Sequence, residues 1–176
     1  LLCMVVASLA AQNPPSESAE ALGKQDPKAM ARNRLAGVRR LLVLGDSITY
    51  AGTYVDLIDT YLAVHETAAP IEVSNVGLPS ETVSGLSEDG HAGGQFARPV
   101  LSERLARTLL QTKPDLVLAC YGMNDGIYLP FDDERFRKFR VGIEAMHAAV
   151  VASGAKIVHV TPPCFDEQKG GHHGYA

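Results

Sequence analysis

The stretch LLVLGDSITYAG, residues 41–52, places a run of apolar residues directly before a glycine, an acid and a serine. A short, continuous apolar run of this kind is typical of a strand buried on both faces of a parallel sheet. Two interpretations of the polar residues after this strand are open. Either Asp46 or Ser47 caps a helix that begins after the strand, or Ser47 is a nucleophile held at the carboxyl edge of a sheet.

Further apolar runs alternate with segments of helical spacing along the rest of the chain. The expected strands are 38–45, 71–77, 115–122 and 156–163, and the expected helices are 53–65, 99–112 and 133–153, with a glycine-rich loop over 85–96. This alternation predicts an α/β fold, in which a parallel sheet is covered by helices on both faces. Ligands of such sheets bind beyond the carboxyl ends of the strands, so functional residues are expected there.

The composition and the N-terminal segment limit the classes of partner. The chain has 176 residues, with 16 Lys and Arg against 20 Asp and Glu and no basic run, so nothing indicates a nucleic-acid partner. Residues 1–11 are apolar and end in small side chains, which predicts a partial signal peptide, export to the periplasm or the exterior, and no stable membrane anchor. A buried amphipathic helix is the alternative. Residues 12–35 are rich in Pro, Ser, Glu, Lys and Ala and predict a flexible linker to a domain over 36–176.

Three residues at or just after the ends of three predicted strands together suit acyl transfer. Such a site needs a nucleophilic oxygen and hydrogen-bond donors aimed at the developing oxyanion. Ser47 offers the oxygen and its own N–H, Gly77 offers a second N–H without a side chain in the way, and Asn124 offers a carboxamide. Taken singly, each position is more typical of a turn or a cap, and it is their conjunction that predicts a site. This chemistry requires no cofactor and no metal.

Three short motifs carry a resemblance to a known family. GDSIT (45–49), NVGLPSET (75–82) and YGMNDG (121–126), in that order, resemble the SGNH/GDSL hydrolase family over about residues 38–163. The resemblance implies a flavodoxin-like three-layer α/β/α sandwich, with Ser47 as nucleophile and Gly77 and Asn124 in the oxyanion hole. One departure is Ser80, where the family often has a second glycine, so the turn after Gly77 stays open.

The larger departure concerns the general base. The family's fourth motif is Asp-x-x-His, in which the His deprotonates the serine and the Asp orients the His, and no such motif occurs in this chain. The expectation is that the C-terminal part of the domain is missing and that the base lies downstream of Ala176. His91 and Asp46 are expected at the substrate pocket. If the chain is no fragment, His172 or His173 is the first alternative base, followed by His91.

The sequence therefore predicts a secreted serine esterase that hydrolyses a small-molecule or carbohydrate ester through an acyl-enzyme on Ser47. Acetyl esters of carbohydrates are one candidate class, and lipid, aryl and thioester substrates stay open. The alternative function is a non-catalytic binding module of the same fold that lacks the base. A nucleotide-binding domain is disfavoured because GDSITYAG matches neither Gly-x-Gly-x-x-Gly nor a P-loop. A disulfide between Cys120 and Cys164 is a further open prediction.

Overall fold

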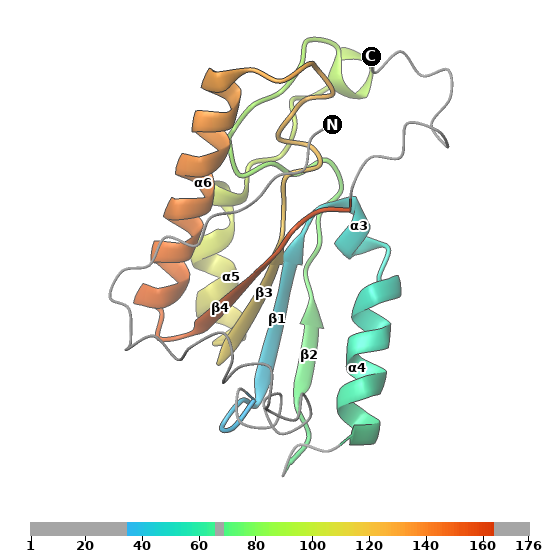
Figure 1. Cartoon of the computed structure of the whole chain (residues 1–176), viewed down its shortest axis with the longest axis vertical. Helices are drawn as coiled ribbons and strands as arrows, with labels where there is room; N and C mark the ends of the chain where they lie inside the picture. The colour runs from blue at the N-terminus through green and yellow to red at the C-terminus, as the bar shows by residue number, and fades with distance from the viewer. Residues whose placement is uncertain (1–34, 66–68, 164–176) are drawn as a thin grey trace, which may run out of the picture.

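The computed structural model describes residues 35–65 and 69–163, and their strands form one parallel sheet (Figure 1). The strands are β1 (Arg40–Gly45), β2 (Glu72–Asn75), β3 (Leu116–Cys120) and β4 (Lys156–Val160), in the order β2-β1-β3-β4. Each lies inside its predicted range, and every pairing is parallel, as predicted. The segment predicted as a partial signal peptide and nearly all of the predicted linker lie outside the described residues, as do Cys164, His172 and His173.

Helices cover both faces of the sheet, which confirms the predicted α/β/α layers. The helices are α3 (Ser47–Tyr50), α4 (Thr53–His65), α5 (Leu105–Thr112) and α6 (Asp133–Ala152), with 3-10 turns η1 (His91–Gly94) and η2 (Leu101–Glu103). In Figure 1, α5 and α6 lie on one side of the sheet and α4 on the other. The single helix expected over 99–112 is divided into η2 and α5, with Arg104 at the break (φ −121°).

The alternation of side chains along β1 explains why its sequence is apolar without interruption. Leu42 and Leu44 pack into a core with residues of α5 and α6, whereas Leu41 and Val43 pack against α4. All four are at most 4% exposed. A fully buried Leu or Val contributes about 1.5 to 3 kcal/mol to the stability of the fold relative to an exposed one. The side chains of β1 therefore stabilise the packing of both helix layers against this central strand.

Two further features of the described residues bear on the predictions. The long helix α6 has an acidic first turn and is capped by Asp132, whose carboxylate accepts a hydrogen bond from the N–H of Arg135 at 2.8 Å.

Among the described helices, none combines the length and the apolar character needed to cross a bilayer.

Candidate active site

Ser47 stands at the sharp turn between the central strand and the first helix. It is the first residue of α3 and is exposed, directly beyond the carboxyl end of β1. The turn depends on Gly45, because a Cβ there would lie 1.9 Å from Oγ1 of Thr49 and 2.8 Å from the carbonyl oxygen of Cys120. As the first helical residue, Ser47 also has a backbone N–H with no acceptor inside its own helix.

Asp46 caps α3 and is only 1% exposed. Its Oδ1 accepts a hydrogen bond from the N–H of Ile48 at 2.9 Å, and burial raises the pKa of its carboxyl group. An open depression of about 480 Å³ beside it is lined by Ser47, Ile48, Ala51, Thr53, Tyr54 and Leu57, without Asp46. The two interpretations of the opening stretch are therefore compatible, because Asp46 caps the helix and Ser47 is left exposed.

Gly77 lies against α3, for a reason that the sequence did not indicate. A Cβ at Gly77 would lie 2.3 Å from the backbone nitrogen of Tyr50. The missing side chain therefore makes room for the protein's own helix α3. The N–H of Gly77 donates to Oδ1 of Asn75 at 3.0 Å, while Nδ2 of Asn75 donates to the carbonyl of Thr49 at 2.7 Å. A role of Gly77 in the oxyanion hole stays a prediction, and it requires that this N–H be shared with the substrate or exchanged.

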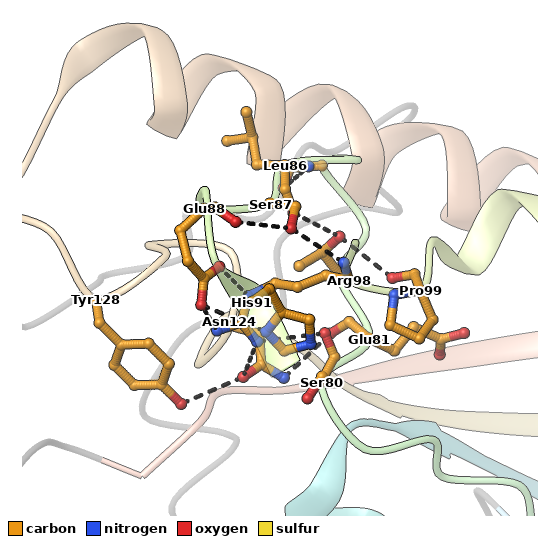
Figure 2. Close-up of polar contacts among 12 residues, drawn as sticks. Ser80, Glu81, Leu86, Ser87, Glu88, His91, Arg98, Pro99, Asn124 and Tyr128 are labelled. Atoms are coloured by element: carbon orange, nitrogen blue, oxygen red, sulfur yellow. Dashed lines mark hydrogen bonds and ion pairs between the residues drawn. The ribbon is translucent and has the colours of Figure 1, made fainter. Parts of the chain in front are cut away.

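Asn124 is 3% exposed and is held by three polar neighbours (Figure 2). Its Nδ2 donates to the backbone carbonyl of Glu81 at 3.2 Å. Its Oδ1 accepts from Nη1 of Arg98 at 3.1 Å and from the hydroxyl of Tyr128 at 3.3 Å. Because β3 is the neighbour of β1 in the sheet, Asn124 belongs to the same carboxyl edge as Ser47.

A buried ion pair between Glu81 and Arg104 holds in place the segment whose carbonyl, at Glu81, binds Asn124. The side chain of Glu81 is fully buried, and each of its carboxylate oxygens accepts from Arg104 at 2.6 Å. The hydroxyl of Tyr121 adds a third bond to Glu81 at 2.6 Å, and Arg104 also donates to the carbonyl of Val76 at 2.9 Å. Burial raises the pKa of Tyr121, so its hydroxyl stays a donor.

Ser80 occupies a left-handed conformation, with φ +65°. Glycine adopts this conformation without the steric cost that a side chain brings. The turn after Gly77 therefore keeps the geometry that favours glycine, although Ser80 occupies this position. The strain falls in the same segment that Glu81 and Asn124 hold in place.

Asp125 ties the next part of the loop to the site. Its Oδ1 accepts from the N–H groups of Val83 and Ser84 at 3.0 and 2.8 Å. The other oxygen, Oδ2, is buried without a hydrogen-bond partner among the described residues, and burial raises the pKa of this carboxyl group. Asn124 and Asp125 together join the end of β3 to the segment after β2.

His91 lies in the same loop cluster but is not bonded to Ser47. Its Nδ1 is 3.5 Å from Oε1 of Glu88, and its ring meets Phe96 edge to face at 5.6 Å. The rings of His147 and His159 are stacked on each other, with nitrogens 3.1 Å apart, on α6 and β4. In the part of the chain that the structure describes, no histidine is hydrogen-bonded to Ser47, and no three potential ligands are grouped to hold a metal ion.

In this parallel sheet a serine, a glycine and an asparagine follow adjacent strands, which agrees with three of the four positions of the SGNH motifs. The model of the GDSL-like Lipase/Acylhydrolase family matches residues 43–175, and the chain belongs to this family.

Solved structures agree with this family. The chain is 25% identical to TesA, covering 76% of this chain and 65% of that one with a TM-score of 0.53. It is 25% identical to the psychrotrophic esterase EstA of Pseudoalteromonas sp., covering 74% and 64% with a TM-score of 0.50. The acetyl xylan esterase AlAXEase shares the fold at 19% identity, covering 68% and 56% with a TM-score of 0.50. The chain thus spans 56% to 65% of the length of these three proteins. No curated protein sequence gives a significant match.

Proposed function

We propose that this chain carries the nucleophile and the oxyanion donors of a serine esterase that hydrolyses carboxylic esters through an acyl-enzyme on Ser47. The observation that carries the proposal is the exposed Ser47 at the carboxyl end of β1, on the sheet edge that also bears Gly77 and Asn124. Membership of the GDSL-like family supports it. The structure of EstA inhibited by monoethylphosphonate also supports it, because phosphonates react with serine nucleophiles.

In the proposed reaction, Oγ of Ser47 attacks the ester carbonyl as a base takes its proton. The negative charge that develops on the carbonyl oxygen is stabilised by the N–H of Ser47 and by the second amide hydrogen of Asn124. Gly77 contributes once its N–H leaves Asn75. The protonated base then gives its proton to the departing alcohol, and a water molecule releases the acid. Loss of one such donor costs roughly 100- to 1000-fold in kcat.

The base is proposed to be a histidine outside the described residues, within an Asp-x-x-His motif downstream of Ala176. His172 and His173 are the alternatives inside the chain. The proposal is supported by the contacts of the described histidines, since His91 faces Glu88 and His147 faces His159. A binding module without catalysis is the second candidate, because no described histidine is bonded to the serine.

The proposed substrate is a small-molecule or carbohydrate ester, with acetyl esters of carbohydrates as one candidate class. The likeness in fold to an acetyl xylan esterase supports that choice. The protein is proposed to act after export, on the strength of the signal-like residues 1–11.

A panel of acyl esters of increasing chain length tests this function in the full-length native protein. We expect turnover that is lost in Ser47→Ala and kept in Ser102→Ala, a matched change at another exposed serine. Asn124→Ala should lower kcat and kcat/KM by similar factors with little change in KM. Equal turnover by Ser47→Ala and the wild type would contradict the proposal, and tight ester binding without turnover would favour the binding module.

A further inference from the structure

The carboxamide of Asn124 can be held in only one orientation. A guanidinium only donates hydrogen bonds and a backbone carbonyl only accepts them. Oδ1 must therefore face Arg98, 3.1 Å away, and Nδ2 must face the carbonyl of Glu81, 3.2 Å away. One amide hydrogen is used by Glu81, and this leaves the other for a substrate oxygen.

Arg98 is itself held firmly and has little capacity left for other ligands. Its side chain is 4% exposed, and its Nε and Nη2 donate to the two carboxylate oxygens of Glu88, each at 2.6 Å. Its Nη1 reaches both Asn124 and, at 3.5 Å, the carbonyl of Ser80. Four of its five N–H groups thus have partners among the described residues, and Glu88 balances its charge.

These contacts make Arg98 a poor site for a substrate anion and a good partner for Asn124. A cation bonded to an amide oxygen withdraws electron density from the amide nitrogen, so the N–H groups become stronger donors. The ring of Tyr128 lies 5.4 Å from the guanidinium carbon, and its hydroxyl also donates to the amide oxygen (Figure 2). Both neighbours therefore act on the same carboxamide, from the side opposite its donor.

We propose that Arg98 is a positioning residue for the oxyanion hole: it fixes the orientation of the Asn124 carboxamide and strengthens the donor that Asn124 presents to the oxyanion. This inference rests on the proposed esterase function and adds a residue that lies outside the three sequence motifs. Glu88 holds Arg98 in place from the opposite side. A purely structural role for Arg98 is the alternative that an experiment has to separate.

The first experiment needs no turnover, so it is independent of the esterase proposal. The side-chain amide signals of the protein labelled with ¹⁵N at asparagine are recorded by NMR, and Asn124 is assigned by the signal that is absent in Asn124→Ala. We expect the amide protons of Asn124 to move upfield in Arg98→Gln, because the polarising cation is gone. They should keep their position in Arg137→Gln, which breaks an exposed pair with Glu134 of the same bidentate kind. An Asn124 signal that is unchanged in a folded Arg98→Gln protein would overturn the proposal.

The second experiment is a double-mutant cycle on ester hydrolysis by the full-length native protein. Arg98→Gln should lower kcat on the order of tenfold with little change in KM, since a donor is weakened and not removed. In an Asn124→Ala background the same change should have no further effect, because Arg98 acts through Asn124. Additive losses, or an unchanged kcat in Arg98→Gln, would contradict the proposal. Loss of turnover in Ser47→Ala separately tests the esterase function.

Chemical rescue covers the case in which Arg98→Gln folds poorly. In Arg98→Ala, added methylguanidinium should restore part of kcat, whereas urea, a neutral molecule of similar shape, should restore less. Circular dichroism recorded in the same solutions shows whether the fold is retained. Equal rescue by both compounds would indicate that Arg98 only fills space, and that result would overturn the proposal.

Discussion

Single glycines decide whether the turn at Ser47 can form. Gly45 and Gly77 both lie in places where a Cβ would collide with neighbouring atoms, 1.9 Å from Oγ1 of Thr49 and 2.3 Å from the nitrogen of Tyr50. At Gly77 the obstacle is backbone, which cannot move aside as the end of a side chain can. Gly77 therefore has a packing role, and its role as an oxyanion donor stays a prediction.

Gly77→Ala should destabilise the protein by about 1 to 3 kcal/mol, the usual cost of forcing an extra methyl group into a packed site. The free energy of unfolding from urea titration measures this loss. Gly126→Ala is the matched control, because a Cβ at Gly126 meets no atom within 4 Å and should change stability by only about 0.5 kcal/mol. If the two variants are equally stable, α3 does not pack against Gly77 as described.

The ends of the strands could be predicted from the sequence, but the polar contacts behind them could not. Ser47, Gly77 and Asn124 could be placed because each comes after a short apolar run, and the parallel order brings such ends to one edge. Nothing in the pattern marked Arg98 or Glu81, because a charged residue in a loop is normally solvated. Here both are buried, Arg98 paired with Glu88 of its own loop and Glu81 paired with Arg104 further along the chain.

At the level of secondary structure, the strands and the long helices were predicted within a few residues. The prediction of a single helix over 99–112 was wrong. Arg104 lies at the break between η2 and α5, where its side chain is bonded to Glu81 and to the carbonyl of Val76. Such a tertiary contact outweighs helix propensity and leaves no trace in the local pattern.

The loop from residue 85 to residue 98 is held by the Glu88–Arg98 pair, which should make stability depend on pH in the acid range. Hydrogen bonds from Arg98 lower the pKa of Glu88 from its ordinary 4.5 to about 2. A carboxyl group with a lowered pKa stabilises the folded state above pH 4.5, and this contribution is lost as the pH falls towards 2.

Glu88→Gln should therefore reduce the free energy of unfolding near neutral pH by about 1 to 2 kcal/mol, an amount discounted for the partial exposure of Glu88. The difference between variant and wild type should shrink between pH 4.5 and about 2. Asp46 and Asp125, whose raised pKa values act in the opposite sense, are present in both proteins and cancel in the comparison. Urea titrations across this range measure the difference, and one that stays constant with pH would refute the assignment.

For the whole molecule, the described sheet has β2 and β4 at its edges. Helix α4 covers one face of the sheet at β1. On the same face, Val158 of the edge strand β4 is 47% exposed. The relatives of known structure are longer, since this chain spans 56% to 65% of their length. The catalytic base is proposed to come from outside the described residues, so the proposed activity has to be tested on the full-length native protein.

The most direct test of the central claim, that Ser47 is the nucleophile, is covalent labelling of the full-length native protein with a fluorophosphonate. Intact mass and peptide mapping would then locate the adduct. We predict one adduct, on the peptide that contains Ser47, and none in Ser47→Ala, while Ser102→Ala is labelled like the wild type. Labelling of Ser47→Ala to the same extent, or an adduct on another serine, would contradict the account.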